Sequence, residues 1–270
     1  KKRGSIKNQP KRVQSRHKNR KAIYSQSPGL WLFGFHAVVA AILNPDRKIR
    51  QFLVTEEAIQ KLRKLQNKAI PIDKAVTSTR SEIDQIIGPD KAHQGITVHT
   101  EPLKGIDLAD VLKPQDDNDK PSLLIALDQV TDPHNVGAVM RSAVAFGAEI
   151  IFTTKHNAPD ETGVMAKAAS GALETIPFVH VTNLKRALKE CQGHGYWSVG
   201  LDAKAEIPLA ALELPPKCVL VLGSEGEGLR NGVAQECDFM ARLPVAGGIE
   251  SLNISNAAAI SMYEWRRQNS

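Results

Sequence analysis

The sequence predicts an α/β protein with two domains, and three observations support this. The chain has 270 residues, a length that suggests roughly two domains. Apolar strand-like runs alternate with helical patterns, which in the second half argues for a parallel sheet. An acidic stretch bounded by two prolines then separates the halves. We expect a tail at 1–28, a small α/β domain at 29–103, a linker at 104–120 and a larger α/β domain at 121–270.

The composition is that of an ordinary soluble globular protein, with 42% hydrophobic and 24% charged residues. No apolar run approaches the length of a membrane span. The basic N-terminus lacks the apolar segment of a secretory signal, so we expect a cytoplasmic protein that does not contact a membrane. Cys191, Cys218 and Cys237 show no CxxC spacing, and the eight histidines form no HxxxH pair. We therefore expect structural thiols and no metal site.

The net charge of +6 is concentrated in the tail. Residues 1–22 hold ten Lys/Arg and no acidic residue, whereas the other 248 residues hold 25 Lys/Arg against 29 acidic residues, a net of −4. So polar a segment cannot bury enough surface to fold alone. Such tails often bind nucleic acid through non-specific, salt-dependent contacts. The alternative is a solvated tail that aids solubility.

The first domain is predicted to alternate short helices and strands. The apolar run that follows Gly34 reads as a helix that Asn44-Pro45 stops. Ala58, Ile59 and Leu62 recur at helical spacing. In order, we expect helices at 34–43, 56–66 and 79–87 and strands at 51–55 and 95–100. The domain shows no obvious catalytic constellation, so His36 and His93 are expected to be structural or RNA-facing.

The second domain is predicted to begin with the strand 122–128, which is almost continuously apolar, as in buried parallel sheets. A short helical piece at 106–112 precedes it in the linker. The further strands are expected at 149–153, 179–181, 196–201, 218–222 and 239–243. The helices are expected at 135–146, 163–169, 183–191 and 253–267.

Three stretches place glycine and polar side chains just beyond a predicted strand, where open α/β sheets bind ligands. They are residues 135–141, 222–229 and 243–260. In the last one, Gly247-Gly248 lets a backbone approach a ligand. Ser251, Asn253 and Ser255 are natural helix-start residues, and a helix start can bind an acceptor-rich ligand. The alternative is a plain turn before a core helix.

The first stretch contains Asn135 and Arg141. Six positions separate them, nearly two helical turns, so we expect their side chains to point to broadly similar faces. An arginine can hold a phosphate in a bidentate way. Most arginines in such helices only form surface ion pairs.

The second stretch is glycine-dense from Gly223 to Gly228. Its G-x-x-G-x-G spacing matches neither a Rossmann fingerprint nor a P-loop. Glu225 and Glu227 would repel phosphates, so a neutral or cationic ligand group fits better. The sulfonium of S-adenosylmethionine is such a group, although the loop alone does not select it.

Taken together and in order, the three stretches resemble the signature motifs of the SpoU/TrmH branch of the SPOUT RNA methyltransferases. The match runs through Asn135-x-Gly137-x-x-x-Arg141, then 220–229, then 243–260. It covers residues 121–270. A weaker match at 34–38 and 93–96 makes the first domain similar to the N-terminal substrate-binding domain of the bacterial 23S rRNA guanosine-2′-O-methyltransferases.

The resemblance implies a deep C-terminal trefoil knot, S-adenosylmethionine bound there by backbone groups, and a homodimer whose active site is shared across the interface. It implies cofactor contacts at Gly223, Leu243 and Leu252. It implies a catalytic group of Asn135, Arg141, Glu225, Ser251 and Asn253. Val245 departs from the pattern, since methionine is common there.

The implied reaction moves a methyl group from the sulfonium to a ribose 2′-oxygen of RNA, with a guanosine in 23S rRNA favoured by the N-terminal domain. Arg141 would stabilise the developing negative charge, either as an activator or within a proton relay. Asn135 and Glu225 would position it or the ribose. Ser251 and Asn253 would hold the loop and the substrate, and helix capping is their alternative or additional role.

Three other functions stay open from the sequence. A tRNA ribose 2′-O-methyltransferase has the same motifs and a different substrate. A non-catalytic RNA-binding factor in ribosome assembly would keep the fold. A nucleotide-binding oxidoreductase is disfavoured because the dinucleotide fingerprint is missing.

Overall fold

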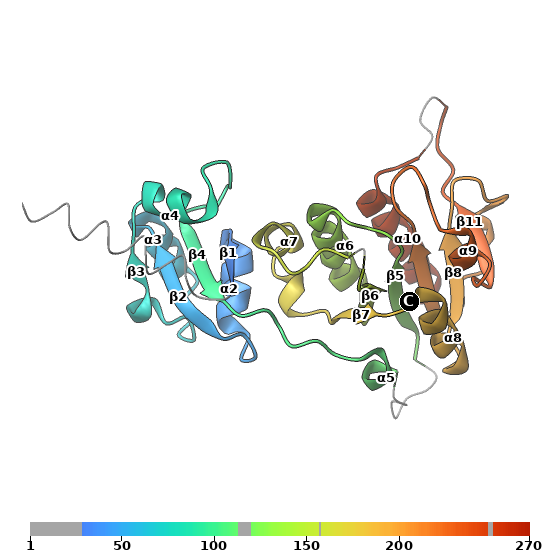
Figure 1. Ribbon diagram of the computed structural model, residues 1–270, viewed down its shortest axis with the longest axis horizontal. Coiled ribbons are helices and arrows are strands. Elements are labelled where there is room, and N and C mark those ends of the chain that lie inside the picture. The colour runs from blue at the N-terminus through green and yellow to red at the C-terminus, as the bar shows by residue number, and fades with distance from the viewer. Residues whose placement is uncertain (1–28, 113–119, 157, 248–250) are drawn as a thin grey trace, which may run out of the picture.

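The computed structural model describes residues 29–112, 120–156, 158–247 and 251–270, which form two sheets with their helices, one toward each end of an elongated molecule (Figure 1). The predicted tail at 1–28, residues 113–119 of the predicted linker and Gly248 lie outside these described residues. The α/β class and the parallel sheet of the second half are as predicted. The first 75 or so described residues and the rest each build one sheet.

The N-terminal sheet has the strand order β1-β4-β2-β3. β4 pairs antiparallel with β1 and β2, and β3 pairs parallel with β2. The strands are β1 (Leu30–Phe33), β2 (Ile49–Val54), β3 (Val76–Thr77) and β4 (Ile96–Thr100), and the helices are α2 (Phe35–Leu43), α3 (Glu56–Lys64) and α4 (Arg80–Ile87). Thr55 and Thr79 cap α3 and α4 through their side chains. β1 and β3 were not predicted.

The C-terminal sheet has seven strands in the order β7-β6-β5-β10-β8-β11-β9, and every neighbouring pair is parallel. The strands are β5 (Ser122–Leu127), β6 (Ile150–Thr154), β7 (Phe178–Val181), β8 (Trp197–Leu201), β9 (Ile207–Pro208), β10 (Lys217–Leu222) and β11 (Phe239–Arg242). All six residues of β5 are buried. β5 and β10 pair directly, so their carboxyl ends lie side by side.

Helices cover both faces of this sheet (Figure 1). They are α5 (Leu108–Val111), α6 (Pro133–Phe146), α8 (Leu184–Gly193), α9 (Asn231–Ala234) and α10 (Ile254–Gln268). Helix α7 (Gly163–Ala169) instead packs between α6 and strand β1 of the N-terminal sheet. Leu123 and Ile125 of β5 pack with α6 and α10 on one face, while Leu124 packs with α8 and α9 on the other. No helix among the described residues is long and apolar enough to span a membrane.

Helix α6 begins two residues before its predicted start. The Asp132 side chain accepts a hydrogen bond from the His134 N–H at 2.9 Å, and Pro133 occupies the first turn, where its missing N–H costs nothing. Gly147 ends the helix in the left-handed conformation, with φ of 76°. The cap fixes the first residue of α6, and it thereby sets the position of Asn135 in the first turn of the helix.

All three cysteines are free. Burial raises the pKa of Cys191 and of Cys237 to about 12, and it raises the pKa of Cys218 as well. Thiols with such pKa values are poor nucleophiles near neutral pH. The cysteines are the structural thiols that the sequence predicted.

A buried arginine joins the two sheets. The Arg47 side chain is fully buried, and its guanidinium donates to Glu174 at 2.6 and 3.1 Å and to Glu161. Asn44 also donates to Glu174, at 2.8 Å. Arg47 and Asn44 belong to the N-terminal half and both glutamates to the C-terminal half. A buried charge without partners is costly, so this cluster holds the halves in one relative orientation.

We expect Arg47→Ala to lower the free energy of unfolding by about 3–5 kcal/mol, because it leaves two carboxylates without their cation. Arg50→Ala is the matched control, since Arg50 pairs with Glu101 at 2.7 Å on the surface and such pairs contribute about 0–1 kcal/mol. Denaturant unfolding followed by fluorescence measures both. Equal losses in the two variants would contradict the assigned role.

Candidate active site

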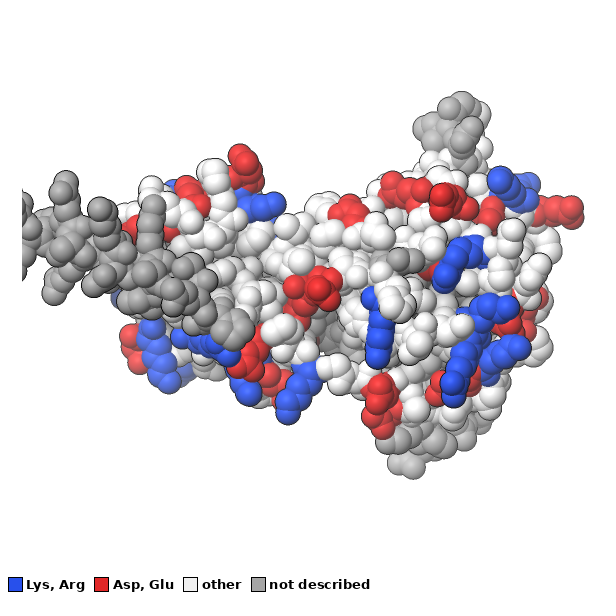
Figure 2. Space-filling model, in the orientation of Figure 1, with Lys and Arg blue, Asp and Glu red and all other residues white. Residues whose placement is uncertain are grey.

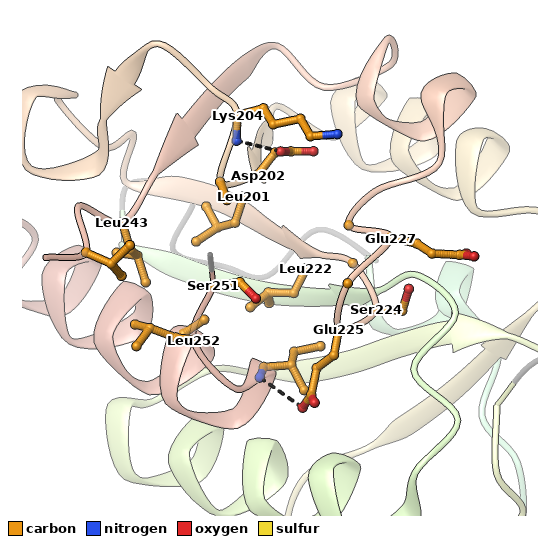
Figure 3. Close-up of a pocket in the computed structure, with 17 residues that line it drawn as sticks. Leu201, Asp202, Lys204, Leu222, Ser224, Glu225, Glu227, Leu243, Ser251 and Leu252 are labelled. Carbon is orange, nitrogen blue, oxygen red and sulfur yellow. Dashed lines mark hydrogen bonds between the residues drawn. The ribbon is translucent and has the colours of Figure 1, made fainter. Parts of the chain in front are cut away.

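A hollow of about 460 Å³ lies at the carboxyl ends of β8, β10 and β11 (Figure 3). Leu201 and Leu222 end β8 and β10, Leu243 follows β11, and Leu252 precedes α10. Figure 3 shows these leucines around the hollow, with Ser251 between them. This is the edge at which open parallel sheets bind ligands. The predicted cofactor residues Gly223, Leu243 and Leu252 all line it.

One wall of the hollow is the loop 223–228, whose backbone conformation requires glycine at several positions. A Cβ on Gly223 would lie 2.1 Å from the carbonyl carbon and oxygen of Gly228. Ser224 and Gly228 form an antiparallel bridge, so the loop folds back on itself. Gly226 and Gly228 have φ of 85° and 68°, values that L side chains avoid. The loop therefore presents backbone groups to the hollow.

The hollow has an acidic lining. Asp202, Glu225 and Glu227 contribute three carboxylates, and Lys204 contributes one cation. A ligand with a positive centre is attracted by this charge, whereas a phosphate is repelled. Asp202 and Lys204 follow β8. The sequence analysis did not predict them as site residues, because the order of strands along the chain does not show that β8 lies beside β10 in the sheet.

Three predicted catalytic residues meet beside the hollow. Oε1 of Glu225 accepts hydrogen bonds from the Nδ2 atoms of Asn135 at 3.0 Å and Asn253 at 2.6 Å. Nδ2 of Asn253 also donates to Oδ1 of Asn135 at 3.1 Å. The same carboxylate oxygen accepts the Ile254 N–H at 3.4 Å (Figure 3). A carboxylate is favoured at this site because it faces the N-terminus of α10.

Asn253 performs two tasks at once. Its Oδ1 accepts the Ser255 N–H at 2.9 Å and the Ser255 hydroxyl at 2.6 Å, which caps α10. Its Nδ2 then reaches Glu225 and Asn135. Ser251 lines the hollow beside Leu252, and within the described part of the chain no hydrogen bond joins it to this cluster.

Arg141 stands apart from the cluster. It is exposed on α6, it does not line the hollow, and within the described ranges it has no hydrogen-bond or ion-pair partner. The expectation that it shares a face with Asn135 was wrong. Six residues make one and two-thirds helical turns, which leaves the two side chains roughly 120° apart.

An ion pair between a buried aspartate and a partly exposed arginine anchors the end of the glycine loop. Asp128 follows β5 and is fully buried. It accepts the Arg230 backbone N–H at 3.1 Å and the Arg230 guanidinium at 2.6 and 2.9 Å. Arg230 follows the loop 223–228, so the pair ties the loop to the neighbouring strand. The sequence analysis did not assign either residue.

Two family models match the chain and together span most of it. Residues 122–263 match the SpoU rRNA Methylase family, and residues 31–105 match the RNA 2′-O ribose methyltransferase substrate binding family. The chain therefore belongs to the SpoU rRNA Methylase family, as the resemblance of its motifs predicted.

Curated relatives extend the match over most of the chain. The 23S rRNA (guanosine-2′-O-)-methyltransferase RlmB of Coxiella burnetii is 37% identical over 239 residues, which cover 88% of this chain and 95% of that protein. The RlmB of Ralstonia nicotianae is 37% identical over 244 residues, with 88% and 96% covered.

A solved structure shows the same fold. The SpoU methyltransferase AviRb from Streptomyces viridochromogenes, in complex with the cofactor AdoMet, superposes with a TM-score of 0.71 at 22% identity. The superposition covers 94% of this chain and 93% of that one.

We expect Gly223→Ala to lower the melting temperature, because the new methyl group meets the Gly228 backbone and overpacking costs about 1–3 kcal/mol. Gly247→Ala is the control, since a Cβ there has no atom within 4 Å and surface changes stay within about 0.5 kcal/mol. Thermal unfolding measures both. A Gly223→Ala variant as stable as Gly247→Ala would show that the loop does not close as described.

Proposed function

We propose that this chain transfers a methyl group from S-adenosylmethionine to a ribose 2′-hydroxyl of RNA, and that its substrate is a guanosine of 23S rRNA in the cytoplasm. The observation that carries the proposal is that residues of all three signature stretches meet in one hydrogen-bonded cluster beside the hollow. The substrate follows from the curated relatives, whose names state 23S rRNA and guanosine. We also propose the division of the chain into a substrate-binding domain at 29–103, a linker at 104–120 and a methyltransferase domain at 121–270.

The lining of the hollow fits the cofactor. Backbone groups at Gly223, Leu243 and Leu252 would hold its adenosine part, and the leucine side chains would cover its apolar surface. The carboxylates of Asp202, Glu225 and Glu227 match a sulfonium better than a phosphate. When bound, the cofactor supplies a methyl group that its sulfonium has already activated.

The residues beside the hollow would align the ribose. The Glu225 carboxylate fixes both asparagine amides, so Asn135 presents its second N–H in a set direction while Asn253 holds the arrangement together. Ser251 would hold the loop and the substrate from within the hollow. Holding the 2′-oxygen in line with the methyl group supplies much of the rate gain in such transfers. Arg141 would stabilise the negative charge that develops on that oxygen.

A second copy of the chain would deliver this arginine. α6 and α10 pack together and leave Val144, Ile260 and Tyr263 exposed, at 37%, 46% and 56%. Arg141 is exposed on the same helix as Val144. A two-fold interface on this apolar surface would bury it and bring Arg141 of one protomer toward the site of the other. The proposal includes the knotted C-terminus that the resemblance implies.

Mixing two inactive variants tests both the reaction and the shared site. Arg141→Ala and Asn253→Ala are each expected to lose methyl transfer while S-adenosylmethionine binding is retained. In an equal mixture, half of the dimers are mixed and each restores one of two sites, so about a quarter of wild-type activity returns. The assay is transfer of labelled methyl to 23S rRNA from a deletion strain, followed by nucleoside analysis for 2′-O-methylguanosine.

Arg186→Ala, a change on the exposed part of α8, is the control and is expected to keep wild-type activity. An inactive mixture would refute the shared site. Labelled methyl on a base would refute the proposed reaction. Labelled methyl on tRNA and not on 23S rRNA would refute the proposed substrate.

A further inference from the structure

A second hollow, of about 390 Å³, lies on the N-terminal domain. We propose that it binds the sugar-phosphate backbone of the RNA substrate, an inference that rests on the function proposed above. Its wall comes from three segments: Lys61 on α3, Arg80 and Asp84 on α4, and Lys91 with His93 on the connection from α4 to β4. Three cations from separate segments thus surround one space.

The charges of the lining favour an anion. Lys61 and Lys91 are exposed, and no ion pair in the described part of the chain engages either ammonium group. Arg80 pairs with Glu57 at 3.1 Å, but their side chains are 61% and 75% exposed. Exposed pairs of this kind are weak, so the guanidinium can turn to a phosphate. Asp84 is the one carboxylate of the lining.

The carboxylate of Asp84 lies against the buried side chain of His93. Nδ1 of His93 accepts the Gly95 N–H at 3.0 Å, so in the neutral ring the proton lies on Nε2. Nε2 lies 3.2 Å from Oδ1 of Asp84, which places this edge of the ring against the carboxylate. One carboxylate oxygen therefore points toward the histidine, and His93 is a structural part of the hollow, one of the two roles expected for it.

The distribution of basic side chains over the surface does not by itself distinguish this hollow from other places on the molecule. Figure 2 shows basic side chains spread over both domains and interrupted by acidic ones. Isolated surface lysines contact a phosphate from one side, whereas a hollow lets several cations approach it together. Neutralisation of phosphates by Lys and Arg supplies most of the sequence-independent affinity for nucleic acid. The convergence of three cations on one hollow distinguishes this place.

The hollow is held in a fixed position relative to the active site. Oε1 of Gln94 accepts the Phe35 N–H at 2.7 Å, which ties the hollow to the start of α2. The neighbouring Gly34 lies against Lys167 of α7 in the other half. Figure 1 shows the connection between α4 and β4 at the upper edge of the N-terminal part of the molecule. An RNA held in this hollow therefore meets an active site that keeps a set position relative to it.

Charge removal at the two unpaired lysines tests the proposal. The double variant Lys61→Gln/Lys91→Gln is compared with Lys68→Gln/Lys74→Gln, which removes two exposed lysines outside the hollow. Filter binding of labelled 23S rRNA from a deletion strain is measured over a series of KCl concentrations. Each lost phosphate contact lowers the slope of log K against log salt by about 0.7–0.9, so we expect the first variant to lose about 1.5 and the control to keep the wild-type slope.

Kinetics separate binding from chemistry. The hollow variant is expected to raise KM for RNA, with kcat and S-adenosylmethionine affinity unchanged, because none of its residues touches the first hollow. A wild-type slope and KM in that variant, or an equal loss in the control, would overturn the proposal. Absence of methyl transfer by the wild-type chain would instead defeat the proposed function, since RNA binding is measured without transfer.

Discussion

One carboxylate oxygen, Oε1 of Glu225, is the acceptor on which the arrangement of the site depends. It accepts hydrogen bonds from Asn135 at the start of α6, from Asn253 before α10, and from the first N–H of α10. Asn135 and Asn253 are 118 positions apart along the chain. The direct pairing of β5 with β10 brings the first two loops together, and the return of α10 onto α6 brings the third. The strand order of the sheet and the packing of α10 on α6 therefore determine which side chains meet at the site.

Two further constraints keep the carboxylate in place. The glycine loop closes only because Gly223 has no Cβ, and the pair of buried Asp128 with Arg230 fixes the end of that loop to β5. On a larger scale, Arg47 fixes the N-terminal half against α7 and its neighbours. Preorganisation of this kind lets a site align reactants without moving at the moment of reaction.

The sequence predicted what depends on local patterns. The long apolar run of β5, the capped helices and the three glycine-containing stretches were all located, and the family follows from those stretches. β1, β3 and β9 are two to four residues long, too short for a periodic signal. Arg47, Asp128 and Asp202 were missed because their partners are distant in sequence and only the topology brings them close. The face of Arg141 was predicted wrongly because six residues were taken as nearly two helical turns, whereas they make one and two-thirds.

The central claim is that Glu225 organises the catalytic group for methyl transfer. The most direct measurement is the single-turnover rate of methyl transfer to 23S rRNA by Glu225→Ala at saturating S-adenosylmethionine. Loss of the shared acceptor frees both asparagines, and misplacement by about 1 Å can cost on the order of 100-fold in rate. We expect a fall of that order with the fold retained, as circular dichroism would show. A folded variant with the wild-type rate would contradict the account.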